Sequence, residues 1–341
     1  MKETRVLIAD DSGFMRLLIS DILSESEGIQ VVGAAVDGKD ALVKVKELKP
    51  DVLLLDMNMG EYDGIYAVKN IMKEAPLPIL ILSSVGNTNL QPIFDALQEG
   101  AVDYLNKPSR GNAKIRLIEN ELIQKIRSVT RAKPMAVKPN SKNTNKHTFD
   151  ESSKYDLVVI GASTGGPSAL EEIIVSLPSN LNVPLVIGQH MPVNFIGPFV
   201  KRLDKLSPLN VVVGEKGMEP TAGTVIIAPG TGNLTLIKNG NKVKIGFTDQ
   251  KFKEYNNPSI NSIMLAAAKV HGSRTMGVIL TGMGKDGVEG MKAIKMAGGY
   301  TIAQNEKSSI IYGMPKAAVQ CGAIDKSIDI KEIGSFIVNS L

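Results

Sequence analysis

The chain has no tryptophan and only one cysteine in 341 residues. A single cysteine excludes an internal disulfide framework and favours a reducing compartment, and we expect Cys321, beside a turn at Gly322, to be a small buried apolar residue. No apolar run approaches the ~18 uncharged residues that a transmembrane helix requires. The opening MKETRVLIADD also places acids where a signal peptide keeps its apolar region. These absences predict a soluble, cytoplasmic protein without direct membrane insertion.

Charge of one sign is not in large excess either. The sequence holds 39 Lys and Arg against 35 Asp and Glu, a formal net charge of +4, which does not indicate nucleic-acid binding. Apolar residues make up 43% of the chain, an ordinary fraction for a soluble α/β protein. The length suffices for two domains that each bury a core of their own.

Residues 5–130 alternate apolar runs with amphipathic stretches. The runs RVLIA, IQVVGAA, DVLLL, PILILSS and VDYLN predict five strands, and the stretches between and after them predict five helices, the last from about residue 112 to 130. Such alternation is typical of a doubly wound, mainly parallel α/β sheet. Ligands of these sheets bind at the carboxyl ends of the strands, so the polar residues at the strand ends are informative.

Acidic, hydroxyl and basic side chains stand at those strand ends. Asp10 and Asp11 close the first strand, Asp56 closes the third, Ser83 closes the fourth and Lys107 follows the fifth. Three carboxylates at one sheet edge repel one another unless a hard cation lies among them, and oxygen ligands of this kind suit Mg²⁺. The Ser83 hydroxyl and the Lys107 ammonium can then bind a phosphoryl group. Together these residues predict an aspartate that becomes phosphorylated in the presence of Mg²⁺.

The joint pattern resembles a response-regulator receiver domain, over residues 1–125. The resemblance implies a flavodoxin-like fold and a histidine kinase as the phosphodonor. It implies these residue roles: Asp56 as the phosphoacceptor; Asp10, Asp11, Asp56 and the backbone carbonyl of Asn58 as Mg²⁺ ligands; Ser83 and Lys107 as the switch hydroxyl and the phosphate-binding lysine. One departure is Gly60 in DMNMGEYDG, where receivers usually carry a proline, and it makes that loop less stiff.

Residues 131–154 separate this half from the rest of the chain. The segment RAKPMAVKPNSKNTNKHTFDESSK carries prolines, serines, asparagines and lysines with hardly an apolar pair, so it cannot bury enough surface to offset the entropy of ordering. It is short and lacks interleaved aromatic residues, which favours a solvated tether over a nucleic-acid-binding tail. We therefore expect a receiver domain at 1–130, a flexible linker at 131–154 and a second domain at 155–341.

From residue 155 onward strands and helices alternate again, and the last predicted element is the helix GMPKAAVQCG. This pattern, with one hairpin around LTLIKNGNKVKIGF, predicts a second mainly parallel, Rossmann-like α/β domain. Within it, DLVVIGASTGGP at 156–167 predicts a strand, a tight turn and a helix. We expect Gly161 and Gly165 to adopt backbone angles closed to residues with a Cβ. Such a turn presents the Ser163 hydroxyl above the sheet edge, in front of a helix N-terminus.

A glycine-rich turn of this kind also serves as a plain connection or as a phosphate-binding loop. The dinucleotide fingerprint G-x-G-x-x-G does not fit, because Ala162 and Ser163 follow Gly161, and a Walker loop does not fit, because no Lys-Ser/Thr follows the glycines. A nucleophilic role for Ser163 therefore depends on partners elsewhere in the chain.

A base for Ser163 should be a histidine at another strand end, and the chain has three histidines. His147 lies in the linker, and His271 precedes Gly272 at a helix end, where it suits C-terminal capping. His190 follows the strand PLVIGQ directly and is the remaining candidate for the general base.

The orienting acid should come from a third strand end, and Asp286 stands in the loop TGMGKDG after the strand GVILTG. The other acids considered are less well placed, in a helix, after a hairpin and past the last helix: Asp204, Asp249 and Asp325. In the resulting triad Ser163 attacks a carbonyl, His190 takes its proton and Asp286 fixes the imidazole tautomer. The backbone N–H groups of Thr164 and Met283 are candidate donors to the oxyanion. These roles predict acyl transfer to water by an esterase or amidase that needs no cofactor.

Several motifs together resemble the catalytic domain of the chemotaxis protein-glutamate methylesterase: GASTGGP, QHMP followed by FVKRL, APG at 228–230, LTGMGKDG and YGMPKAA. With the receiver in front, the resemblance covers essentially the whole chain. It implies hydrolysis of glutamyl methyl esters on the cytoplasmic helices of chemoreceptors, with deamidation of particular glutamines, and phosphorylation of Asp56 by a chemotaxis histidine kinase. Asn233 stands near a position where a histidine is common in the family, a departure that we expect to affect only a peripheral contact.

The regulation that we expect is that the unphosphorylated receiver packs over the Ser163 rim and that phosphorylation loosens it. Two other interpretations stay open, a serine hydrolase for another ester and a non-enzymatic module that binds a partner when phosphorylated. No helix-turn-helix or clustered basic face follows the linker, and the C-terminal half is rich in glycine and strands, which disfavours a transcription factor.

Overall fold

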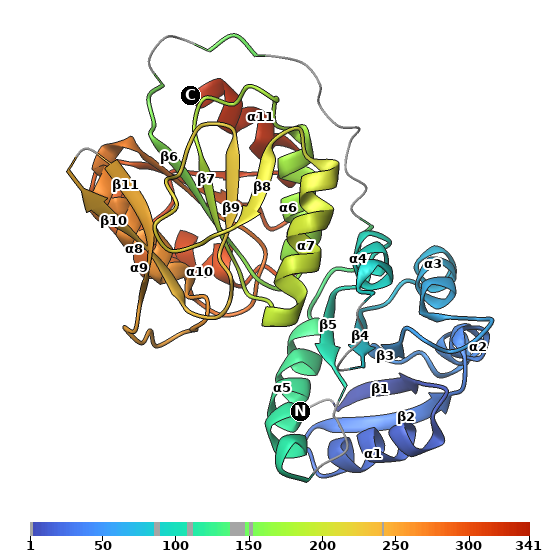
Figure 1. The fold of residues 1–341 in the computed structure, drawn as a ribbon. Helices are drawn as coiled ribbons and strands as arrows, with labels where there is room; N and C mark the ends of the chain where they lie inside the picture. The colour runs from blue at the N-terminus through green and yellow to red at the C-terminus, as the bar shows by residue number, and fades with distance from the viewer. Residues whose placement is uncertain (1–2, 85–88, 108–111, 137–146, 150–152, 241) are drawn as a thin grey trace. The chain divides into compact units, whose positions relative to one another are not determined.

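The computed structural model describes residues 3–84, 89–107, 112–136, 147–149, 153–240 and 242–341 (Figure 1). The chain divides into two compact units, Met1–Lys138 and Pro139–Leu341. Each unit is built on its own parallel sheet with helices between the strands, so the prediction of two mainly parallel α/β domains is confirmed. Among the described residues, no helix is both long and apolar enough to cross a membrane.

The first unit holds a five-stranded parallel sheet in the order β2-β1-β3-β4-β5. Its strands are β1 (Thr4–Ala9), β2 (Ile29–Ala35), β3 (Val52–Asp56), β4 (Ile79–Ser83) and β5 (Asp103–Asn106). Its helices are α1 (Gly13–Ser24), α2 (Gly38–Leu48), α3 (Gly64–Glu74), α4 (Gln91–Gln98) and α5 (Asn112–Val129). Helices lie on both faces of the sheet (Figure 1), which explains why β3 and β4 are buried along their whole length and almost entirely apolar.

Three helices of this unit begin at a side-chain cap. Ser12, Asp37 and Asp63 each accept a hydrogen bond from the backbone N–H three residues later, at the start of α1, α2 and α3. The caps fix where each helix leaves the loop that follows its strand. They therefore help to hold the loops after β1 and β3, where the acidic residues lie.

The second unit holds a seven-stranded parallel sheet in the order β14-β13-β12-β6-β7-β9-β8, and a separate antiparallel ribbon, β10–β11. The strands are β6 (Leu157–Ala162), β7 (Leu185–Gln189), β8 (Asn210–Val213), β9 (Thr224–Ile227), β10 (Asn233–Asn239), β11 (Lys242–Thr248), β12 (Thr275–Ile279), β13 (Tyr300–Gln304) and β14 (Lys326–Ile328). The helices are α6 (Gly166–Ser176), α7 (Val193–Leu206), α8 (Ile260–His271), α9 (Val288–Met296), α10 (Met314–Gln320) and α11 (Ile330–Ser340), with a 3₁₀ turn, η1 (Gly272–Arg274).

Strand β6 lies in the middle of this sheet, between β12 and β7. Helices α6, α7 and α11 cover one face, and α8, α9 and α10 cover the other (Figure 1). Because the three central strands are parallel and adjacent, their carboxyl ends meet at one edge of the sheet. The loops after β6, β7 and β12 therefore lie close together.

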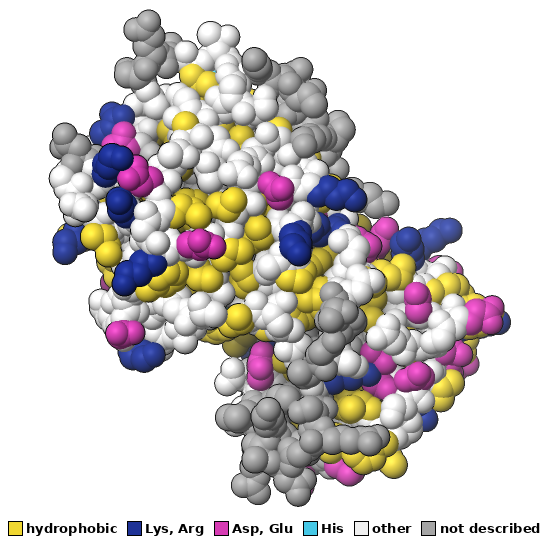
Figure 2. Space-filling model, viewed as in Figure 1, with side chains coloured by type: hydrophobic (Ala, Val, Ile, Leu, Met, Phe, Trp, Pro, Cys, Tyr) yellow, Lys and Arg dark blue, Asp and Glu magenta, His cyan; other side chains and the backbone are white. Residues whose placement is uncertain are grey.

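The predicted hairpin is confirmed as the ribbon β10–β11, which packs on α8. Figure 2 shows Lys and Arg side chains gathered over this ribbon. Lys242 and Lys244 lie 3.2 and 3.7 Å from a carboxylate oxygen of Glu219, so part of this charge is paired. Exposed pairs of this kind contribute little to stability.

Two elements, β14 and α11, lie beyond the last predicted helix. The signal that could have located α11 is D-x-x-E at 329–332, an N-cap acid followed three residues later by a glutamate. Asp329 is the N-cap of α11 and accepts a hydrogen bond from the Lys331 N–H. The expectation that Cys321 is buried was wrong, because this residue follows α10 at the surface and is exposed.

Of the predicted linker, the structure describes residues 131–136, 147–149 and 153–154, and the expectations for residues 137–146 and 150–152 fall outside the described residues. The His147 N–H donates to Asn180 Oδ1 at 3.0 Å, and the His147 carbonyl accepts from Asn180 Nδ2 at 2.7 Å. Asn180 lies between α6 and β7. The linker is therefore hydrogen-bonded at His147 to the loop between α6 and β7.

Candidate active site and phosphoacceptor site

Ser163 follows β6 directly, in the turn that leads into α6. Gly165 has a φ of +75°, which suits a residue without a Cβ, and α6 begins at Gly166 with Pro167 in its first turn. The Ser163 N–H donates to the Thr281 carbonyl at 3.1 Å, so the turn is tied to the chain just beyond β12. The predicted strand, turn and helix are confirmed.

Gly161 does not have the conformation that the sequence analysis expected. It lies within β6 and has no positive φ, so the requirement for glycine is steric. A Cβ at this position would lie 2.4 Å from Ile260 Cγ2. Ile260 is the first residue of α8. The missing side chain thus lets the N-terminus of α8 approach the strand that carries Ser163.

Ser163, His190 and Asp286 form one hydrogen-bonded chain. His190 follows β7, and its Nδ1 lies 3.2 Å from Ser163 Oγ. Its Nε2 lies 2.8 Å from Asp286 Oδ2, in the loop between β12 and α9. A neutral imidazole with its hydrogen on Nε2 donates to the Asp286 carboxylate and leaves the Nδ1 lone pair for the Ser163 hydroxyl. The chain has the connectivity of a nucleophile, a base and an orienting acid.

The Asp286 carboxylate is held by the N-terminus of α8. It accepts hydrogen bonds from the Ile260 N–H at 2.7 Å, the Asn261 N–H at 3.0 Å and the Ser259 hydroxyl at 3.3 Å. The Gly287 N–H adds a further bond at 3.0 Å. Unpaired N–H groups and the helix dipole both stabilise a negative charge at this end of a helix. The carboxylate is thereby fixed in the orientation that faces His190.

The two candidate oxyanion donors belong to chain segments that lie next to Ser163. Thr164 is the next residue of the turn and is buried, and its carbonyl accepts from the Thr281 hydroxyl at 3.0 Å. Met283 follows Gly282, where a Cβ would lie 2.7 Å from Ser163 Cβ. Within the described residues, the Met283 N–H donates to no protein acceptor. A backbone N–H in this position can serve an oxyanion near Ser163.

Sequence reasoning missed two residues of this site. Gln189 is buried, and its Nε2 donates to the carbonyls of Ser163 at 3.0 Å and His190 at 2.8 Å. Tyr255 stacks on His190, with the ring centroids 3.8 Å apart. A polar residue at the end of the apolar run PLVIG, directly before His190, was a usable signal for Gln189. No sequence signal marks Tyr255, because it stands in a loop distant in sequence from His190.

Asn233 has a larger role than the peripheral contact that the sequence analysis assigned to it. Its side chain is buried, and its Oδ1 accepts from the Asn257 N–H at 2.8 Å and the Ser259 N–H at 2.9 Å. Its Nδ2 donates to the Gln250 carbonyl and to Asn256 Oδ1. Asn233 therefore fixes the segment that leads into α8.

His271, the last residue of α8, has its Nδ1 3.4 Å from Asp156 Oδ2.

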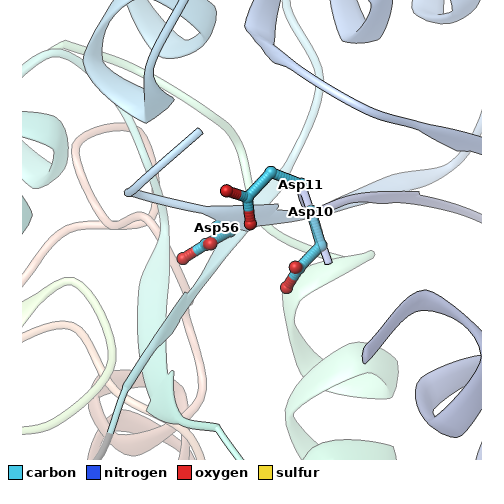
Figure 3. A group of neighbouring side chains, drawn as sticks. All are labelled: Asp10, Asp11 and Asp56. Carbon is cyan, nitrogen blue, oxygen red and sulfur yellow. The ribbon is translucent and has the colours of Figure 1, made fainter. Parts of the chain in front are cut away.

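Acidic residues also gather at the carboxyl edge of the sheet in the first unit (Figure 3). One carboxylate oxygen from each of Asp10, Asp11 and Asp56 lies within 4.8 Å of the others. Asp10 and Asp56 are buried, whereas Asp11 is exposed. Lys107 Nζ lies 2.7 Å from an oxygen of both buried acids. Ser83 ends β4 and is buried, and Asn58 follows Asp56 by two residues and is exposed.

Burial raises the pKa of Asp56 above its ordinary value of 3.8, although Lys107 and the Asn58 N–H act in the opposite direction. Among the described residues, Asp56 Oδ1 and Ser83 Oγ are buried without a hydrogen-bond partner. An Asp56 oxygen without a partner, close to two further carboxylates, suits a Mg²⁺ ion. A bound Mg²⁺ would favour the ionised form of Asp56. Asp10, Asp11 and Asp56 are the residues that would hold this ion.

Gly60 has a φ of +73°, which a proline at this position cannot adopt.

Both halves of the chain match known protein families. A family model described as CheB methylesterase matches residues 158–337, and one described as response regulator receiver domain matches residues 6–119. A protein-glutamate methylesterase/protein-glutamine glutaminase of Lawsonia intracellularis is 37% identical over 99% of this chain and 99% of its own length. A protein-glutamate methylesterase/protein-glutamine glutaminase 1 of Carboxydothermus hydrogenoformans is 40% identical over 100% of both chains.

A solved structure is also similar to the second unit. The crystal structure of the Thermotoga maritima CheB methylesterase catalytic domain is 37% identical, with a TM-score of 0.54, and the match covers 55% of this chain and 99% of that chain. The family match, the full-length relatives and this structure agree with one another. The chain therefore belongs to the CheB methylesterase family and carries a response regulator receiver domain in front of its methylesterase domain.

Proposed function

We propose that this protein hydrolyses glutamyl methyl esters on the cytoplasmic helices of chemoreceptors, and deamidates particular glutamines there, for sensory adaptation in chemotaxis. The observation that carries the proposal is the hydrogen-bonded chain of Ser163, His190 and Asp286 at a sheet edge. It is supported by full-length relatives that are named protein-glutamate methylesterase/protein-glutamine glutaminase. The esterase reaction needs no metal or other cofactor, because these side chains supply the nucleophile and the base.

The first half of the reaction transfers the glutamyl group to the enzyme. Ser163 Oγ attacks the ester carbonyl carbon while its proton passes to His190 Nδ1, and the Nε2–H bond to Asp286 stabilises the resulting imidazolium. The N–H groups of Thr164 and Met283 donate to the oxyanion. The intermediate then breaks its bond to the methoxy oxygen, which takes the proton from His190. Methanol leaves, and the glutamyl group stays esterified to Ser163.

The second half releases the receptor. A water attacks the acyl carbonyl and gives its proton to His190 Nδ1, and the bond to Ser163 Oγ then breaks as that oxygen takes the proton back. The product is a receptor glutamate. With a glutamine substrate the same steps release ammonia in place of methanol.

The receiver controls this activity through Asp56, which accepts a phosphoryl group from a chemotaxis histidine kinase. Asp10, Asp11, Asp56 and the Asn58 carbonyl would hold Mg²⁺, which would supply positive charge to neutralise the phosphoryl oxygens. Ser83 and Lys107 bind the transferred phosphoryl group. We assign the receiver to residues 1–130, the linker to 131–154 and the catalytic domain to 155–341. The protein acts in the cytoplasm, without membrane insertion and without nucleic acid.

The direct test compares the wild type with Ser163→Ala on methylated receptor. We expect methanol release by the wild type and a fall in kcat of about 10⁴-fold or more in the variant, because the covalent route is lost. Ser335→Ala is the control, since Ser335 is an exposed residue of α11. Full activity in Ser163→Ala would show that the nucleophile is wrong. Turnover of small methyl esters without turnover of receptor would favour a hydrolase of another ester.

A further inference from the structure

One face of the His190 imidazole is covered by the ring of Tyr255. The two ring centroids are 3.8 Å apart, and the planes are inclined by 21°, which is a stacked arrangement. The His190 side chain is only 8% exposed, whereas Tyr255 is 43% exposed. Tyr255 therefore separates the imidazole from solvent on one face and has part of its own surface open.

The loop that carries Tyr255 is held on both sides of this residue. Asn256 Oδ1 accepts from the Phe252 N–H at 2.9 Å, and Asn256 Nδ2 donates to the Phe252 carbonyl at 2.8 Å. Asn233 binds the Asn256 side chain and accepts from the Asn257 N–H. These bonds fix the backbone before and after Tyr255. The stack therefore belongs to an ordered loop between β11 and α8.

The two hydrogen bonds of His190 do not hold its ring equally well in all directions. Nδ1 and Nε2 both form their bonds in the plane of the ring, so these bonds resist movement of the ring out of that plane only weakly. A second ring stacked at van der Waals distance opposes that movement. It also presents a negative π face to the imidazole, which attracts a cation.

We propose that Tyr255 is a positioning residue for His190, which keeps the imidazole in reach of Ser163 and Asp286 at once and stabilises the imidazolium formed during the reaction. This inference rests on the proposed function. The groups that face the imidazole are Ser163 from the turn after β6, Asp286 from the loop before α9 and Tyr255 from the loop before α8. Asp286 balances the imidazolium charge at one edge, and Tyr255 does so at one face.

The test uses two substitutions in the full-length protein. Tyr255→Phe keeps the aromatic face, and Tyr255→Leu keeps an apolar cover without a π face. On methylated receptor we expect Tyr255→Phe to stay within about twofold of the wild type and Tyr255→Leu to lose about tenfold in kcat with KM unchanged. The acidic limb of the pH profile of kcat/KM should move to lower pH by about half a unit in Tyr255→Leu, because the imidazolium is less stabilised.

A second readout does not depend on the receptor. A fluorophosphonate phosphonylates Ser163, with a bond from Oγ to phosphorus formed and fluoride released. This step requires the nucleophile and its base, so its rate should fall in Tyr255→Leu and not in Tyr255→Phe. If the wild type reacts with the fluorophosphonate but does not demethylate receptor, the proposed substrate is wrong while the role of Tyr255 is still tested. If Tyr255→Leu does not fold, Tyr255→Met replaces it.

The matched control is Tyr300→Leu, which removes the stack between Tyr300 and Phe336 at the start of β13. It should leave kcat and the pH profile unchanged. A raised KM with unchanged kcat in Tyr255→Leu would mean that Tyr255 contacts the substrate, and the positioning role would be wrong. Equal losses in Tyr255→Phe and Tyr255→Leu would assign the effect to the hydroxyl and would also overturn it.

Discussion

The two ring nitrogens of His190 face different partners, Nδ1 toward Ser163 and Nε2 toward Asp286. Asp286 receives bonds from the backbone at Ile260 and Asn261, so its orientation does not depend on the histidine. The imidazole is therefore docked against an acceptor that is already fixed. This arrangement decides which nitrogen acts as the base and where the Ser163 hydroxyl must lie.

A stability prediction at the residue scale concerns Asp56. Because burial raises its pKa, the folded receiver binds a proton here more tightly than the unfolded chain does, and the ionised carboxylate costs stability. This cost grows as the pH rises from the ordinary value of 3.8 through the raised value, and it is fully present above that value. In the absence of Mg²⁺ we expect Asp56→Asn to melt at a higher temperature than the wild type at neutral pH.

The difference should shrink as the pH falls toward the ordinary carboxyl value, where the wild type is protonated as well. Thermal melts at several pH values measure it, and Asp11→Asn is the control because Asp11 is exposed. Added Mg²⁺ should raise the melting temperature of the wild type more than that of Asp56→Asn. A lower melting temperature for Asp56→Asn at neutral pH would show that the contact with Lys107 outweighs the burial of the charge.

Sequence reasoning reached the residues that stand at strand ends. Ser163, His190 and Asp286 each follow or lie near a central strand, and parallel strands bring their carboxyl ends together, so a one-dimensional pattern carries three-dimensional information there. Tyr255 could not be found in this way, because its partner belongs to another segment and its own position carries no motif. Asn233 was noticed only as a departure from the family pattern, and its hydrogen bonds to residues 250–259 could not be read from the sequence. The need for glycine at position 161 was explained by its backbone angles, which was wrong. The true cause is a close contact with Ile260, and a local sequence pattern does not show contacts with distant segments.

At the scale of elements, the N-terminus of α8 is the part of the fold that organises the active site. Its cap, Ser259, accepts from the Ser262 N–H at 3.2 Å and donates to Asp286 at 3.3 Å. The same helix begins at Ile260, which fills the space left by Gly161. The start of one helix therefore sets the distance between the acid and the strand of the nucleophile.

This role can be tested with Ser259→Ala. Loss of the cap should lower the free energy of unfolding by about 1 kcal/mol, and loss of the bond to Asp286 should lower kcat on methylated receptor several-fold, since the carboxylate has one donor fewer. Denaturant unfolding and steady-state kinetics measure the two effects.

Ser12→Ala is the matched control, because Ser12 caps α1 in the other unit by accepting from the Met15 N–H. It should cost a comparable amount of stability without changing kcat. If both variants had wild-type kcat, the α8 cap would have no influence on Asp286.

For most elements the hydrophobic pattern predicted whether the segment is a helix or a strand. It did not predict the order of the strands within a sheet. β6 pairs with β12 and with β7, and only the second of these neighbours is also next in the sequence of strands. Strand neighbours are chosen by long-range packing, which no local run of residues records. The last helix, α11, was missed although its capping sequence was readable at Asp329. The strand before it, β14, has only three residues, two of them exposed, so no apolar run marked another strand and helix there.

At the scale of the whole molecule, one chain carries both a receiver and a methylesterase domain, and we expect phosphorylation of the first to change the activity of the second. Each unit contains a complete sheet and its own group of polar residues at the carboxyl edge. For the receiver to control the esterase, the protein must have two arrangements that differ in esterase activity. Phosphorylation of Asp56 must change the difference in free energy between them. A shift of about 100-fold in activity corresponds to ~2.7 kcal/mol.

We therefore expect acetyl phosphate with Mg²⁺ to raise turnover of methylated receptor by the full-length protein. Asp56→Asn should show the basal rate and no response, because it has no carboxylate to phosphorylate. Lys107→Ala should weaken the response, since this lysine contacts the carboxylate of Asp56. The response should also be lost when Mg²⁺ is chelated, whereas basal turnover, which needs no metal, should remain. Equal turnover with and without acetyl phosphate, or a full response in Asp56→Asn, would contradict control of the esterase through Asp56.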